Sequence, residues 1–102
     1  MTEITAEAYG SAVSLTDDTL TIRATSKIGR AALFGPSDQN EVTLPLEQIA
    51  TVDHAAPKMG GLVNGHLDIR TTDGKRYEVH YRAKKNADFQ PLAEALSAAI
   101  HA

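Results

Sequence analysis

The 102-residue sequence contains no cysteine and no tryptophan, and only 5% of its residues are aromatic. Without cysteine there can be no disulfide, no thiolate zinc site and no cysteine nucleophile. The scarcity of aromatic side chains means that a core has to be built mainly from leucine, isoleucine, valine and alanine. Because 42% of the residues are hydrophobic and 23% are charged, the composition is that of a globular protein and not of a disordered tail.

Long hydrophobic runs and targeting signals are also missing. No apolar stretch approaches the roughly 20 residues of a transmembrane helix, and residues 1–10 lack the basic and apolar regions of a signal peptide. A cytoplasmic location is therefore the default expectation. The formal net charge of −3 gives no general attraction to nucleic acid, which we do not expect as a partner. The length is typical of one domain, so we expect a single domain over residues 1–102.

The C-terminal segment has the clearest pattern in the chain. Its apolar residues form one stripe at helical spacing: Phe89, Leu92, Ala93, Leu96, Ala99 and Ile100. Asp88 is a plausible N-cap, because its carboxylate can accept hydrogen bonds from the first turn. That choice places Pro91 in the first turn, where its missing N–H costs nothing. We predict one amphipathic helix that packs through this stripe.

The segment before this helix predicts a bulged hairpin. Leu67 and Ile69 alternate with polar residues in one strand, and Tyr77 and Val79 do so in the next. A two-residue turn would place the apolar residues of the two strands on opposite faces, which is costly. A three-residue loop over residues 72–74, with Gly74 left-handed, instead pairs Ile69 with Tyr77 and Leu67 with Val79.

The N-terminal half predicts further strands. Across a turn at residues 16–19, Val13 pairs with Ile22 and Leu15 with Leu20. Another strand is expected over residues 27–34, and the next one at Val42 and Leu44, ended or bent by Pro45. Leu46, Ile49 and Val52 follow, with a short turn at residues 47–48 that lets the chain change direction. Residues 54–61 are expected to form a loop. The total is about seven strands and no helix before the C-terminal one, hence a mainly β (α+β) fold: a bent antiparallel sheet or partly open barrel, capped by one helix.

This order resembles the bacterial members of the pleckstrin-homology-like superfamily. Four segments carry the resemblance: an opening hairpin with an acidic turn (residues 13–23), a central Leu-Pro-Leu segment (43–52), a following strand (64–69) and the start of the closing helix (87–92). The sequence has no counterpart of the short helical module that many of these proteins carry after the helix. The resemblance implies a scaffold for binding proteins, peptides or lipid headgroups, and sometimes for self-assembly.

A basic concentration near the end of the chain is the first candidate site. We single out Arg76, Arg82, Lys84 and Lys85, which can meet a phosphate, an acidic peptide or an anionic membrane. They are equally compatible with solvated charges in front of a helix. The resemblance would place a phosphoinositide site in the loop between the first two strands. That loop is expected at Asp17 and Asp18, whose charges repel phosphate, so a lipid headgroup is a possible but disfavoured partner.

Two histidines form the second candidate site. In the bulged register His66 and His80 are directly opposite on the polar face, near enough to share a zinc or copper ion, with Asp68 and Glu78 alongside. A register shifted by two residues would pair Asp68 with His80 and separate the two rings. No other metal-binding spacing supports such a site, so two solvent-facing histidines are the simpler interpretation. An apolar loop tip at Met59 and Leu62 is a further potential partner contact.

No catalytic motif is present: no serine has a nucleophile-elbow context, and no cofactor is expected. We therefore expect a non-catalytic protein-interaction or self-assembly module, because a bent open sheet leaves edge strands and a groove beside its helix. The first alternative is a ligand- or anionic-headgroup-binding domain that uses the basic patch. The second is a surface metal-binding domain that uses His66 and His80.

Overall fold

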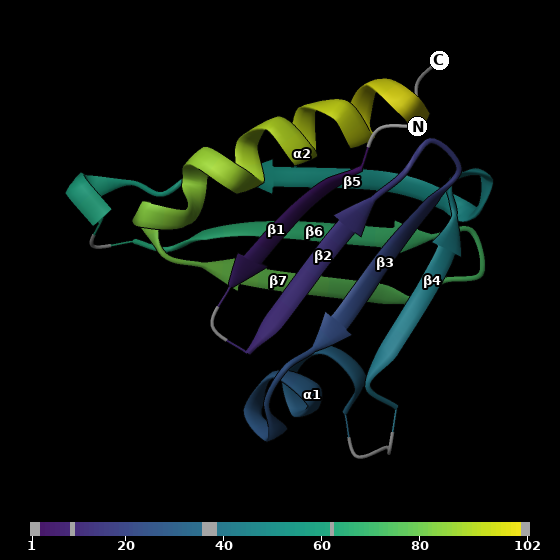
Figure 1. Ribbon diagram of the computed structural model, residues 1–102, viewed down its shortest axis with the longest axis horizontal. Coiled ribbons are helices and arrows are strands. Elements are labelled where there is room, and N and C mark those ends of the chain that lie inside the picture. The colour runs from purple at the N-terminus through teal and green to yellow at the C-terminus, as the bar shows by residue number, and fades with distance from the viewer. Residues whose placement is uncertain (1–2, 9, 36–38, 62, 101–102) are drawn as a thin grey trace.

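Seven strands in two antiparallel sheets form the body of the molecule, in a computed structural model that describes residues 3–8, 10–35, 39–61 and 63–100. The first sheet has the order β1-β2-β3-β4: β1 (Ile4–Ala8), β2 (Ser11–Leu15), β3 (Thr19–Ala24) and β4 (Glu41–Pro45). The second has the order β5-β6-β7: β5 (Ile49–Ala55), β6 (Gly65–Thr71) and β7 (Arg76–Tyr81). The sheets face each other with their strands crossing steeply (Figure 1), and a short 3-10 turn, η1 (Leu46–Gln48), connects them. The prediction of a mainly β fold with a C-terminal helix is confirmed.

Both predicted hairpins have the expected register. Val13 pairs with Ile22 and Leu15 with Leu20 between β2 and β3. Between β6 and β7, Leu67 pairs with Val79 and Ile69 with Tyr77, which excludes the register shifted by two residues. Gly74 has a φ of +88°, and its N–H donates to the Thr71 carbonyl at 3.2 Å. The hydrophobic phase and the glycine were together sufficient to define this turn.

The strand predicted over residues 27–34 is wrong, and so is the expectation of no earlier helix. This segment is the helix α1 (Lys27–Phe34), which begins where the Ser26 hydroxyl accepts a hydrogen bond from the Gly29 N–H at 3.0 Å. Gly29 and Leu33, one helical turn apart, face inward. The strand β1 was not predicted, because only Ala6 is fully buried in it. The expected total of about seven strands is right because β1, which was not predicted, offsets the strand wrongly predicted over residues 27–34.

The closing helix α2 (Asn86–Ile100) begins three residues earlier than predicted. A 3-10 turn, η3 (Ala83–Lys85), leads directly into it, so Asp88 lies in the first turn and is not the N-cap. Pro91 consequently lies inside the helix, beyond the first turn. The predicted apolar face is correct in its buried members: Phe89, Leu92, Ala93 and Leu96.

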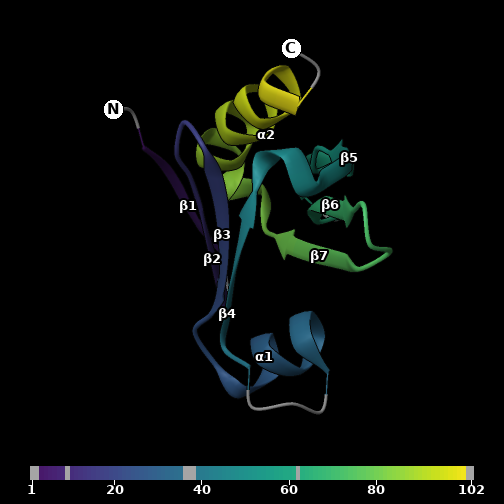
Figure 2. The ribbon, with the colours of Figure 1, turned by 90° about the vertical axis from the view of Figure 1, so that its right-hand side faces the viewer.

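The core lies between the two sheets, and the two helices close it at opposite ends (Figure 2). α2 packs against β1 and β5, and α1 packs against β3 and β7. Tyr77 and Tyr81 are buried, as predicted, and Tyr81 stacks on Phe89 with ring centroids 4.2 Å apart. His54, which was assigned to a loop, lies in β5. None of the helices in the described part of the chain is long and apolar enough to cross a membrane.

Candidate functional site

Three of the four predicted ligand-binding cations come together. Arg82 precedes η3, and Lys84 and Lys85 lie within it. Together with Glu7 and Ala8 at the end of β1, these cations line a hollow of about 190 Å³. These three residues are called the η3 cluster below. They lie next to each other because the 3-10 turn folds Lys84 and Lys85 back beside Arg82, whose carbonyl accepts a hydrogen bond from the Lys85 N–H at 2.9 Å.

The fourth cation, Arg76, is not part of this site. It lies at the opposite end of β7, about 20 Å from Arg82, because the two residues are six positions apart along an extended strand. Its Nε donates to both carboxylate oxygens of Asp68 at 3.0 Å, and its Nη2 lies 2.7 Å from Glu78 Oε2. The hydrogen bonds and charge of Asp68, with a smaller contribution from Glu78, raise the pKa of the Arg76 guanidinium. Grouping Arg76 with the η3 cluster was therefore wrong: it is held in an ion pair.

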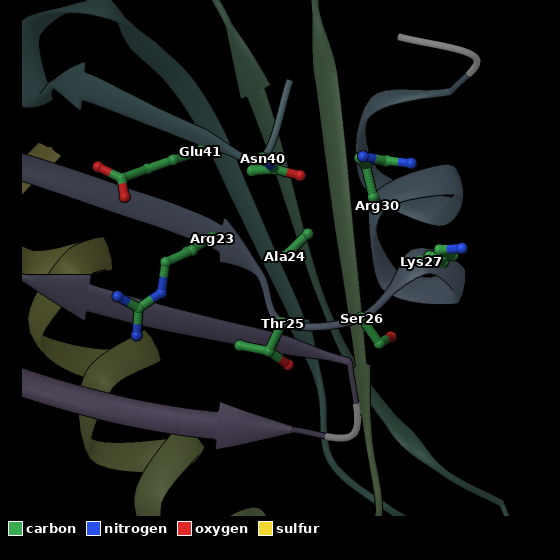
Figure 3. Close-up of a pocket in the computed structure, with 8 residues that line it drawn as sticks. All are labelled: Arg23, Ala24, Thr25, Ser26, Lys27, Arg30, Asn40 and Glu41. Atoms are coloured by element: carbon green, nitrogen blue, oxygen red, sulfur yellow. The ribbon is translucent and has the colours of Figure 1, made fainter. Parts of the chain in front are cut away.

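A second group of cations was not found from the sequence. Arg23 on β3, with Lys27 and Arg30 on α1, lines a hollow of about 330 Å³ together with Asn40 and Glu41 (Figure 3). These three cations are called the α1 cluster. Figure 3 shows Arg23 and Glu41 on one side of Asn40, and the two cations of the helix on the other.

This cluster was missed because residues 27–34 were predicted to be a strand and are the helix α1. On a strand, Lys27 and Arg30 would point to opposite faces, because their separation of three is odd. On a helix the same separation places them on one side. The Ser26 cap was the signal in the sequence that could have revealed the helix, and with it the cluster.

Both clusters adjoin the turn between β1 and β2. Glu7 and Ala8, which line the hollow at the η3 cluster, are the residues of β1 that lead into this turn. On the other side, Gly10 accepts a hydrogen bond from the Thr25 N–H at 2.9 Å, and Thr25 lines the hollow at the α1 cluster. The connection between the first two strands thus lies between Ala8 and Ser11, and the structure describes Gly10 of it.

The placement of Asp17 and Asp18 in the first interstrand loop was therefore wrong. Because β1 precedes the first strand predicted from the sequence, these two acids lie in the turn between β2 and β3. That turn is at the far end of β2 from Gly10. The electrostatic argument against an anionic ligand does not apply to the β1–β2 turn, which has cations on both sides.

His66 and His80 are directly opposite each other, with ring centroids 5.7 Å apart. The two acids predicted beside them, Asp68 and Glu78, differ in what they contact. Glu78 Oε1 lies 2.5 Å from His80 Nε2, whereas Asp68 is buried and forms an ion pair with Arg76. Within the described ranges, no three histidine or acidic side chains converge as a metal-binding group.

His54 was not singled out from the sequence, yet it links three elements. Its Nε2 is hydrogen-bonded to the Tyr81 hydroxyl, which in turn donates to Asn86 Oδ1 at 2.8 Å. Burial lowers the pKa of His54 and the nearby charge of His66 lowers it further, while Glu94 partly opposes them. This chain joins β5 and β7 to the start of α2, so the ring supports the fold beneath the helix.

The predicted apolar loop tip is confirmed in part. Met59 is 72% exposed, with a positive φ of 57°. Leu62 lies outside the described residues, and its neighbour Val63 is 44% exposed.

Comparison with known proteins gives no further guidance. No family model matches this chain, and no curated protein matches it. The function is therefore argued from the chain's own residues.

Proposed function

We propose that this chain is a non-catalytic protein-interaction module of the pleckstrin-homology-like plan, and that it binds an acidic segment of a partner protein beside the β1–β2 turn. One observation carries this proposal. The η3 cluster and the α1 cluster adjoin this turn from two sides and contain, at three residues each, six of the ten lysines and arginines of a chain whose net charge is −3. The pleckstrin-homology-like plan is supported by the order of the elements, in which two sheets are followed by a helix over their open end.

The separation of the clusters favours an extended ligand. A compact anion can occupy only one hollow, whereas an extended acidic segment that crosses the turn engages both. Each exposed ion pair is expected to contribute only about 0.2–1 kcal/mol, so measurable affinity requires several pairs at once. Binding should weaken with salt, because exposed charges are screened over about 8–10 Å at physiological ionic strength.

The test is fluorescence anisotropy with a labelled decaglutamate peptide at low and moderate salt. We expect saturable binding by the wild-type chain at low salt. The double variant Lys84→Glu/Lys85→Glu should lower the affinity about tenfold or more, because it reverses two charges of one cluster. The double variant Lys27→Glu/Arg30→Glu should do the same at the other cluster.

A control with the same change in charge comes from the opposite end of β6 and β7. Arg70 and Lys75 are exposed and line a separate hollow at that end. The variant Arg70→Glu/Lys75→Glu should therefore bind within about twofold of the wild type. No saturable binding by the wild type, or an equal loss in all three double variants, would contradict the proposal.

An anionic lipid headgroup is the second candidate. It is favoured by the cations on both sides of the first interstrand turn, where an acidic pair had been expected. Co-sedimentation with vesicles that contain phosphatidylserine distinguishes it from the first. Pelleting of the wild type but not of the η3 variant, without any binding of the peptide, would replace the protein partner with a membrane surface.

A further inference from the structure

A row of charged side chains crosses the outer face of the second sheet and ends at His80. It starts at Asp68, a carboxylate whose side chain is only 7% exposed. Arg76 Nη2 lies 2.8 Å from Asp68 Oδ2 and 2.7 Å from Glu78 Oε2, and Glu78 Oε1 lies 2.5 Å from His80 Nε2. Each contact therefore restricts the next side chain, from the buried acid to the exposed imidazole.

Simple electrostatics explains the first part of this row. Asp68 and Glu78 are directly opposite on β6 and β7, and like charges in that position repel. A buried carboxylate also requires a partner. Arg76 meets both requirements by bridging the two acids, and this holds Glu78 where its second oxygen reaches His80.

The last part of the row is not required for folding. His80 is exposed at 56% of its side chain, so its ring could remain in water at little cost. Instead, Glu78 Oε1 lies at Nε2 of the ring, so Nδ1 is the ring nitrogen that this carboxylate does not engage. A histidine whose second nitrogen donates to a carboxylate is the arrangement usual in metal sites.

The second imidazole faces the first across the strand pair. The ring centroids of His66 and His80 are 5.7 Å apart, at an interplanar angle of 47°. With metal–nitrogen bonds of about 2.1 Å, two imidazoles that share one ion have their ring centres about 5–6 Å apart. The observed centroid separation lies within this range.

We propose that His66 and His80 bind one divalent transition-metal ion of the zinc and copper class, and that Glu78 orients His80 from outside the coordination shell. Imidazole is the ligand type that suits these ions. No third histidine or acidic side chain in the described part of the chain completes the site. Water therefore fills the remaining positions, and the ion is open to exchange. The site is separate from the two cationic clusters and does not depend on the proposed function.

The test uses tag-free, chelator-treated full-length chain and zinc alone as the probe. Isothermal titration should give one zinc per chain. Zinc should also raise the melting temperature, because an ion that bridges β6 and β7 binds only the folded chain. Magnesium and calcium should have no effect, because they prefer oxygen ligands.

Three variants separate the proposed roles. His66→Asn and His80→Asn should each abolish the zinc response and leave the metal-free melting temperature nearly unchanged, because neither ring is buried. Glu78→Gln, a positioning change, should weaken zinc binding about 10-fold or more without changing the stoichiometry. Arg70→Asn, on the same face, is the matched control and should bind zinc normally. A zinc response that persists in the double variant His66→Asn/His80→Asn, or less than half an ion per wild-type chain, would overturn the proposal.

Discussion

At the scale of single residues, the backbone of Gly29 in α1 lies in close contact with that of Gly10 in the β1–β2 turn. A β-carbon on Gly29 would lie 1.8 Å from the Gly10 carbonyl oxygen and 2.6 Å from its carbon. Gly10 has a φ of +86° and accepts the hydrogen bond from Thr25 that closes this corner. The absence of two side chains is therefore what allows α1 to lie against the first sheet and to place its cations beside the turn.

The variant Gly29→Ala tests this contact, and two effects of opposite sign compete in it. Helix propensity alone favours alanine by about 0.5–1 kcal/mol. Overpacking against backbone costs about 1–3 kcal/mol or more, because the Gly10 carbonyl cannot rotate away as a flexible side chain could. We expect a net loss of about 1–2 kcal/mol in the free energy of unfolding, measured by urea denaturation.

A control variant for this measurement comes from the exposed side of the same helix. Ala32→Gly loses only the propensity, at about 1 kcal/mol, and keeps the contact. If Gly29→Ala were more stable than the wild type, helix propensity would dominate and the close contact would not constrain the helix.

At the scale of elements, the apolar pattern of the sequence predicts the hairpins, whereas the only local sign of α1 that we identify is its Ser26 cap. The β6–β7 hairpin carries its information locally: two alternating strands and Gly74, in a phase that only a three-residue loop satisfies. The segment of α1 has only eight residues, and those facing inward, such as Gly29 and Leu33, are too few for a clear helical stripe. In so short an element, the contacts with β3 and β7 outweigh the local pattern.

Gly74 gives a prediction at this scale, because it contributes only its backbone conformation. Nothing lies within 4 Å of a β-carbon built at this position, so a substitution there meets no steric obstacle. Gly74→Ala should lower the free energy of unfolding by about 1–2 kcal/mol, the cost of a left-handed alanine. Gly74→Asn should lower it less, because asparagine tolerates this conformation better. Urea denaturation measures both variants. Equal losses in their free energy of unfolding would contradict this account of the turn.

At the scale of the whole molecule, the candidate sites differ in how far the sequence could predict them. The η3 cluster was found because its members are close neighbours in sequence. The opposition of His66 and His80 followed from the register of one hairpin. The α1 cluster and the pairing of Arg76 with Asp68 depend on which element each residue occupies and on what covers it, and the alternation of apolar residues reports neither.

Stability as a function of pH reflects how the second sheet is joined to α2 through His54. This ring faces His66 from β6, the Tyr81 hydroxyl from β7 and Glu94 from α2. Burial, and then the charge of His66, lower the pKa of His54 from its ordinary value of 6.5, against a smaller opposing effect of Glu94. The folded chain therefore binds a proton at His54 less readily than the unfolded chain does.

The sign of the effect follows from linkage. His54 contributes its stabilisation fully above pH 6.5, and the contribution is lost as the pH falls through the lowered pKa of the folded state. Urea denaturation at pH 7.5, 6.5 and 5.5 should therefore show a loss of stability toward acid in the wild type that is smaller in His54→Gln. Glu94→Gln should steepen the loss, because it removes a nearby charge that favours the protonated ring. Wild-type and His54→Gln curves that stay parallel across this range would show that the histidine beneath the helix does not couple the fold to pH.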